Sequence, residues 1–184
     1  MIIRNDDVSA NSNFQSITDM YRTIKMFYPD VEIWSCITLL SKDSSDGAVY
    51  PGSPFKKNDL KFFFDVDQYL PTSIANRIPG SKIVSHGLWH FNHAVVTSHL
   101  QEASIVSSCR LLKTNVFVPP FNAWNKDTQD ICESNGVRLV KFDEGWRSLE
   151  HNKFNPTHPL WYFHSWRYTL QEFERVLTNQ EVMV

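Results

Sequence analysis

The sequence has little of what marks several large classes of protein. Its three cysteines, Cys36, Cys109 and Cys132, lie far apart without Cys-x-x-Cys spacing, which predicts reduced and mostly buried thiols. It has no run of 18 apolar residues, so we expect no transmembrane span. No charged and apolar leader precedes the strand-like run that begins at residue 2, so the sequence as written predicts a cytoplasmic protein.

The chain also lacks a strong excess of charge of either sign and the sequence motifs of common nucleophiles. The net charge is −2 and no run of basic residues is present, so we expect no nucleic-acid partner. The chain lacks a glycine-rich phosphate loop and a Gly-x-Ser-x-Gly elbow, which argues against chemistry at a serine nucleophile. At 184 residues, with 42% hydrophobic and 21% charged residues, the chain is predicted to form one globular domain over residues 1–184.

Apolar runs alternate with helical patterns along the chain. This alternation is typical of βα units with a buried parallel sheet, and therefore of an α/β protein. Strands are predicted at 1–4, 31–40, 82–85, 115–118, 137–142 and 160–163, and helices at 17–28, 97–112, 127–134 and 169–177. Residues 41–58 are predicted to form a long loop, 61–65 a strand or core edge, and 71–79 a short helix or turn.

Capping residues mark several helix boundaries. Asn125 is placed to cap the helix that follows it, and Gly136 stands where a C-terminal glycine belongs. Thr169 to Glu172 has the pattern of a capping box. The pattern Ser16 to Asp19 can start the first long helix, with Asp in place of the usual Glu.

Two short stretches carry metal-binding chemistry. Asp6 and Asp7 follow the apolar start of the chain, and His86 and His90 follow the apolar pair Ile83-Val84. One carboxylate and two imidazoles form a three-ligand set for a divalent metal that leaves a position open. Zinc is the first choice, and cobalt, nickel, manganese and iron accept the same ligands.

The second carboxylate is then free to act as a base beside the metal, the arrangement that a metal-assisted hydrolase needs. The residues alone leave open which aspartate binds the metal. His93 follows His90 closely, and we do not expect it to be a ligand.

Polar and aromatic residues follow the later strands. Pro119-Pro120 fixes a rigid turn, and Phe121, Asn122 and Trp124 form either a groove wall or a turn that leads into the next helix. Asp143 follows a predicted strand and has either a role beside the site or a loop role.

His164 stands at the end of an aromatic strand, with Trp166 just beyond it. An imidazole in this position suits general-acid chemistry near neutral pH, and the alternative is a packed core histidine.

The order of these motifs resembles the polysaccharide deacetylase family, the NodB-type enzymes of carbohydrate esterase family 4, over about residues 1–177. The motifs are Asp6-Asp7, His86-Gly87-x-x-His90, Phe117 to Asn122, and Phe163-His164. The resemblance implies an α/β fold, a distorted and compact (β/α) barrel. It also implies a metal-dependent hydrolase that removes acetyl groups from an N-acetylated or O-acetylated sugar or polysaccharide.

By position, the resemblance implies a role for each motif residue. Asp6 would be the catalytic base and His164 the acid that protonates the leaving amine. The metal ligands would be Asp7, His86 and His90, and the groove would be lined by Pro120 and Phe121.

One departure from the family pattern leaves alternatives open. The family has an arginine two residues before its Pro-aromatic pair, and this chain has Val118 there. Arg4 or another cation could take its place. One alternative function is therefore a catalytically degenerate glycan-binding module. Another is a metal-dependent amidase for a non-sugar amide, which the lack of an export signal motivates.

Overall fold

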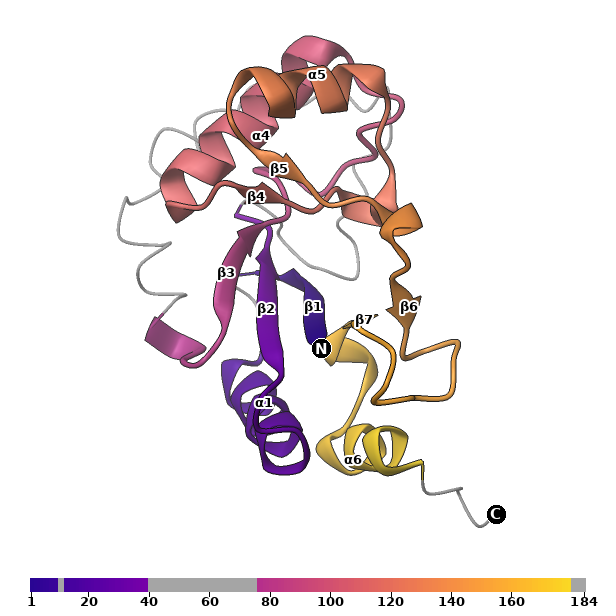
Figure 1. Cartoon of the computed structure of the whole chain (residues 1–184). Helices are drawn as coiled ribbons and strands as arrows, with labels where there is room; N and C mark the ends of the chain where they lie inside the picture. The colour runs from indigo at the N-terminus through magenta and orange to yellow at the C-terminus, as the bar shows by residue number, and fades with distance from the viewer. Residues whose placement is uncertain (10–11, 40–75, 180–184) are drawn as a thin grey trace.

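The structure, a computed structural model, describes residues 1–9, 12–39 and 76–179 (Figure 1). In these residues a single sheet holds seven strands in the order β5-β4-β3-β2-β1-β7-β6. All of its strand pairs are parallel. The sheet curls into a half-barrel, with α1 beside α6 at one end and α4 beside α5 at the other. The predicted α/β fold with a distorted, compact (β/α) barrel is thereby confirmed.

The elements follow the predicted alternation of strand and helix, except that the sequence did not predict β6. The strands are β1 (Ile2–Val8), β2 (Glu32–Ile37), β3 (Lys82–Ser85), β4 (Val116–Phe117), β5 (Arg138–Leu139), β6 (Arg147–Ser148) and β7 (Leu160–Phe163). The α-helices are α1 (Phe14–Phe27), α4 (Ser98–Leu112), α5 (Lys126–Ser134) and α6 (Leu170–Thr178). Short 3₁₀ turns are η1 (Pro120–Asn122), η2 (Phe142–Glu144) and η3 (Ser165–Arg167). The stretches 41–58, 61–65 and most of 71–79 lie outside the described residues.

Several boundaries differ from the prediction, and the strand predicted at 31–40 ends at Ile37. The first helix begins at Phe14, because the Asn13 side chain accepts a hydrogen bond from the Ser16 amide and caps the helix earlier than expected. β1 does not end before the aspartate pair but continues to Val8. The strand predicted at 137–142 is only two residues long, since the chain turns into η2 after it.

Two predicted helix caps are confirmed. The Asn125 side chain accepts a hydrogen bond from the Thr128 amide at 3.0 Å, and the Asn125 amide donates one to Oγ1 of Thr128 at 3.1 Å. Thr169 and Glu172 form the expected capping box. These bonds satisfy amide groups that the first turn of a helix leaves unpaired.

Both faces of the sheet are buried, as a parallel sheet requires. Ile33 packs into the core that α1 and α6 cover, and its neighbour Trp34 packs into a second cluster on the other face. Each large side chain buried in this way contributes about 1.5–3 kcal/mol to folding. The three cysteines are free and buried, as expected. None of the helices in the described part of the chain is long and apolar enough to cross a membrane.

Candidate metal centre

The carboxyl ends of parallel strands bring the predicted site residues to one edge of the sheet. Asp6 and Asp7 lie near the end of β1, His86 directly follows β3, and His164 directly follows β7. His90 follows in the loop after β3. In barrels built from parallel strands, this edge is where functional side chains gather.

An irregularity in β1 turns Asp7 toward the same hollow as Asp6. Regular strand geometry would place Asp6 and Asp7 on opposite faces of the sheet. The pairing of β1 with β2 shifts register between Asn5 and Val8, and Asp7 has a φ of 60°. Such a bulge re-aims a side chain at a cost in backbone strain. As a result, both carboxylates line one hollow.

Asp7 is the centre of a buried three-residue cluster. Its Oδ1 lies 3.1 Å from Nε2 of His86 and 2.6 Å from Nε2 of His90. The three ligand atoms lie within 4.8 Å of one another, and all three residues are buried. Burial raises the pKa of Asp7, but hydrogen bonds with His86 and His90 outweigh this and hold it well below its ordinary value. Asp7 is therefore an ionised carboxylate facing two imidazoles.

The hydrogen bonding of His86 shows that this group fits a divalent metal. Its Nδ1 lies 2.8 Å from the carbonyl oxygen of Val118, which can only accept, so Nδ1 carries the proton. Nε2 then donates a hydrogen bond to Oδ1 of Asp7 only if it carries a second proton, whereas in a neutral ring its lone pair faces that oxygen. A cation between the two atoms relieves this repulsion, and a backbone carbonyl behind a histidine ligand is a common arrangement at metal sites.

A glycine shapes the turn between the two histidines. Gly87 has a φ of 95°, a backbone conformation that residues with a side chain rarely adopt. A Cβ atom there would lie 2.8 Å from the carbonyl oxygen of Trp89 and 3.1 Å from Oγ of Ser104. Both the conformation and the space therefore require glycine, and this turn carries His90 back toward Asp7.

Asp6 lies beside the cluster and has an oxygen free to accept a proton. Its Oδ2 is 3.3 Å from Nη2 of Arg4, a fully buried arginine. Its Oδ1 is buried without a hydrogen-bond partner within the described residues. A carboxylate with one engaged and one open oxygen can serve as a general base.

His164 faces Asp7 from across the hollow and is held from behind by Glu150. Nε2 of His164 lies 3.7 Å from Oδ2 of Asp7, and Nδ1 lies 3.0 Å from Oε1 of Glu150. The same Glu150 oxygen accepts a hydrogen bond from the His164 amide at 2.8 Å. Burial lowers the pKa of His164, but the bond to Glu150 and the nearby aspartates outweigh it, so the pKa is raised. This arrangement points Nε2 toward the hollow.

The hollow has a volume of about 370 Å³ and two aromatic side chains at its rim. Phe121 is 52% exposed, and its ring centroid lies 4.6 Å from that of His90. Trp166 is 47% exposed and lies beside His164. The residues that line the hollow are Asp6, Asp7, His86, His90, Phe121, Asn122, Tyr162, His164, Trp166 and Arg167.

Three residues with predicted substrate contacts lie away from the hollow. Pro120 is buried at the start of η1 and is not part of the lining. The Trp124 ring lies 4.4 Å from the ammonium group of Lys141 and is not part of the lining. Asp143 is exposed on η2, because β5 ends at Leu139 rather than directly before Asp143.

Sequence reasoning missed Glu150, Tyr162 and Arg167. Glu150 follows β6, a two-residue strand without a hydrophobic pattern, so no signal pointed to it. Tyr162 lies in the predicted aromatic strand, where alternation along the strand could have placed its side chain opposite Trp161 and Phe163.

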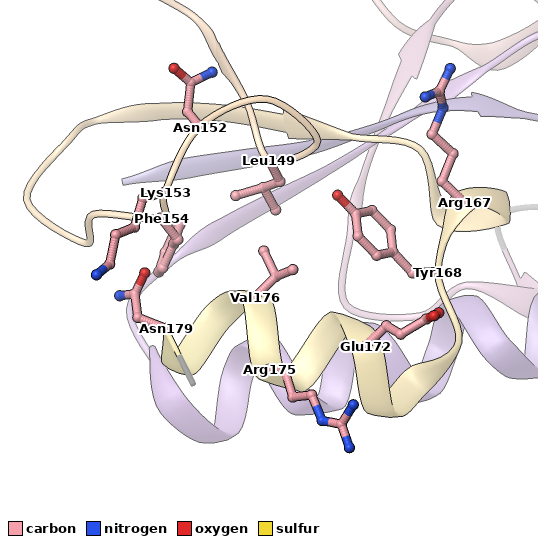
Figure 2. Close-up of a pocket in the computed structure, with 10 residues that line it drawn as sticks. All are labelled: Leu149, Asn152, Lys153, Phe154, Arg167, Tyr168, Glu172, Arg175, Val176 and Asn179. Carbon is pink, nitrogen blue, oxygen red and sulfur yellow. The ribbon is translucent and has the colours of Figure 1, made fainter. Parts of the chain in front are cut away.

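A second, larger hollow of about 500 Å³ lies over α6 (Figure 2). Leu149, Val176 and the Tyr168 hydroxyl group point toward its centre, whereas Arg175 points outward. Arg167 lines both hollows, but its guanidinium group points away from the other side chains in Figure 2. Of the described residues, only Asp7, His86 and His90 form a group that could hold a metal ion, so this second hollow has none.

No family model matches the sequence, and no curated protein matches it. Several solved structures, however, match the fold of this chain. A family 4 carbohydrate esterase from Streptomyces lividans, in complex with acetate, matches with a TM-score of 0.58 and 10% identity, over 96% of this chain and 84% of the esterase. The fold is that of the family 4 carbohydrate esterases. This likeness agrees with the distorted barrel that the sequence predicts.

Two structures of BA3943 share the family 4 fold. Wild-type BA3943 from Bacillus anthracis, described as a family 4 pseudoenzyme, matches with a TM-score of 0.58 and 10% identity over 97% of this chain. A BA3943 mutant described as having restored enzymatic activity matches with a TM-score of 0.60 and 12% identity over 97% of this chain. The chain spans about three fifths of BA3943, 59% and 61% in the two structures.

Proposed function

We propose that this protein is a metal-dependent hydrolase that removes acetyl groups from an N-acetylated or O-acetylated sugar or polysaccharide. The observation that carries the proposal is the buried Asp7, His86 and His90 cluster, with Asp6 beside it and His164 facing it. The fold, shared with a family 4 carbohydrate esterase in complex with acetate, supports the same reaction class.

Asp7, His86 and His90 would hold the metal, for which zinc is the first choice, although cobalt, nickel, manganese and iron accept the same ligands. When bound, a divalent metal supplies a Lewis acid for the acetyl carbonyl and makes water a better nucleophile near neutral pH. The Val118 carbonyl orients His86, and the Gly87 turn places His90.

The side chains around the cluster would carry the proton transfers. Asp6 accepts a proton through Oδ1 from the water that attacks the acetyl carbonyl carbon. His164 donates a proton from Nε2 to the leaving nitrogen as the bond from carbon to nitrogen breaks, so acetate and a free amine leave. Phe121 and Trp166 present exposed aromatic faces on which a sugar ring can stack.

The test is to measure the metal content of the purified protein by mass spectrometry and its acetate release from N-acetylated oligosaccharides. We expect about one metal per chain and acetate release that falls by about 10³-fold in Asp6→Asn, a variant that keeps the metal. A wild-type protein that binds zinc or cobalt but releases no acetate from any acetylated glycan would contradict the proposed reaction.

A glycan-binding module without turnover is the second candidate. Two observations favour it: Val118 stands where the family pattern has arginine, and wild-type BA3943 with the same fold is described as a pseudoenzyme. Glycan binding by wild-type protein that releases no acetate, with the same affinity in Asp6→Asn, would support this candidate over the hydrolase.

A further inference from the structure

Arg4 is an unusually buried cation for its position next to the site. Its side chain is 0% exposed and lies on the same face of the sheet as the cluster around Trp34 and Trp146. The guanidinium carbon lies 4.4 Å from the Trp146 ring and 5.0 Å from the Tyr162 ring. Burying a charge destabilises the fold unless the charge has a partner. The contacts of the Arg4 guanidinium group therefore indicate its role.

The anionic partner of Arg4 is Asp6. Nη2 of Arg4 lies 3.3 Å from Oδ2 of Asp6, and no other cation among the described residues forms an ion pair with this carboxylate. Residues two apart on a strand point to the same face, so β1 itself sets the pair. The pair engages one oxygen of Asp6 and leaves Oδ1 without a hydrogen-bond partner within the described residues.

The same nitrogen of Arg4 also holds the groove wall. Nη2 donates a hydrogen bond to Oδ1 of Asn122 at 2.5 Å. Phe121 and Asn122 are consecutive residues with φ values of 59° and 52°, a conformation that is unfavourable for a bulky side chain such as Phe. Strain of this kind persists only where surrounding contacts hold it, and the bond to Arg4 is such a contact. This turn also places the Phe121 ring against His90.

We propose that Arg4 is a positioning residue that fixes the orientation of the Asp6 carboxylate and ties the strained Phe121–Asn122 turn to the same guanidinium group. This inference rests on the proposed function, since it assigns Arg4 a role in that reaction. Nη2 carries two N–H groups, which can serve both partners at once, and the flat guanidinium group lies against the Trp146 and Tyr162 rings. A lysine ammonium at the end of a flexible chain has no flat face to stack on these rings.

The kinetic test combines Arg4→Lys with Asp6→Asn. We expect Arg4→Lys to keep the metal, to raise KM because the bond to Asn122 is lost, and to lower kcat by about 100-fold, the size of effect that a small misplacement of a reacting group produces. In the Asp6→Asn background the same change should have almost no further effect on kcat, because its target is already gone. A control is Arg138→Lys, which also has a carboxylate partner and a nearby tryptophan ring but is remote from the site.

Each outcome decides between the two proposals. Equal losses of kcat in both backgrounds, or no loss at all, would overturn the role of Arg4 while leaving the hydrolase intact. A wild-type protein without acetate release would overturn the hydrolase and, with it, this role.

A second variant tests the turn without altering the ion pair. Asn122→Gly accepts the left-handed conformation but removes the bond to Arg4. We expect it to raise KM with kcat little changed, because the wall formed by Phe121 is no longer fixed. Unchanged KM in a folded, metal-loaded Asn122→Gly variant would overturn the second half of the proposal, and this holds even if Arg4→Lys fails to fold.

Discussion

The two hollows of this protein differ in size and in chemistry, and the smaller one has the features of a functional site. The hollow over α6 has a volume of about 500 Å³ and is centred on Leu149, Val176 and the Tyr168 hydroxyl group. The hollow at the sheet edge has about 370 Å³ and contains two aspartates and three histidines.

The two hollows also differ in how their residues affect the stability of the fold. At the sheet edge, Asp7 and Phe121 have positive φ values and Arg4 is buried as a charge. None of these features stabilises the chain by itself. Backbone strain and buried charge of this kind are concentrated at sites where side chains must be held in one functional arrangement. The hollow over α6 has an apolar floor continuous with the main core. Chemistry, rather than volume, therefore separates the two.

The largest expected effect comes from removing two ligands at the sheet edge. We expect His86→Ala with His90→Ala to lose the metal and all acetate release, because Asp7 alone cannot hold the ion. Metal content by mass spectrometry checks this. Val176→Ala in the other hollow is the control and should keep both. Full metal content in the double variant would show that the ion binds elsewhere.

A smaller effect is expected at Glu150, which holds His164 from behind. Glu150→Gln keeps the shape and the acceptor oxygen but removes the charge, so kcat should fall by about 100-fold, within the range for general-acid catalysis. Steady-state kinetics with KM and metal content measured in parallel test this. Glu144→Gln, which alters an exposed ion pair with Arg138, should leave kcat unchanged. Equal kinetics in the two variants would show that the charge of Glu150 does not assist His164 in the reaction.

The hollow over α6 should respond in stability and not in turnover. Leu149 is 4% exposed in the main core, so Leu149→Ala should lower the free energy of unfolding by about 2–5 kcal/mol. Urea denaturation gives this value, and kcat at a temperature where the variant stays folded should equal that of the wild type. A selective loss of kcat would connect this hollow to the reaction.

The smallest expected effect is the pH dependence of the contribution from Glu150. Burial raises the pKa of this carboxyl, but the hydrogen bond with His164 outweighs it and lowers the pKa from 4.5 to about 2. A carboxyl with a lowered pKa in the folded state stabilises that state above the unfolded value and loses this contribution as the pH falls.

We therefore expect a stability difference between the metal-free wild type and Glu150→Gln that is full above pH 4.5 and shrinks as the pH falls toward about 2. Urea denaturation of both proteins between pH 7 and pH 3 measures it. A difference that stays constant over this range would mean that the charge of Glu150 does not stabilise the fold.

Local pattern was enough to predict most of the fold. Strands rich in β-branched residues and helices with periodic apolar residues have local patterns that favour one structure over the others. For this reason β3, β7, α4 and α5 agree closely with the prediction. Capping at Asn125 depends on residues three apart, which a sequence shows directly. The order of the motifs also indicated which side chains would meet at the sheet edge, because parallel strands end on one side.

What the sequence could not show depends on three-dimensional pairing. The bulge that turns Asp7 toward the hollow comes from the register between β1 and β2 and leaves no local signal. Glu150 reaches His164 through the β6–β7 pairing. Asp143 was placed at a strand end only because β5 was predicted to be longer than it is. The question of which cation faces Asp6 has a direct geometric answer in Arg4.

The position of β1 in the sheet also bears on how this protein is assembled. Residues 2–5 of β1 pair with residues 160–163 of β7, so the two strands that carry Asp6 and His164 come from distant parts of the chain. Contacts with such a large sequence separation form slowly, because closing the loop between them costs chain entropy. We therefore expect the pairing of β1 with β7 to form late in folding, so that the hollow is completed only when the C-terminal part of the chain is in place.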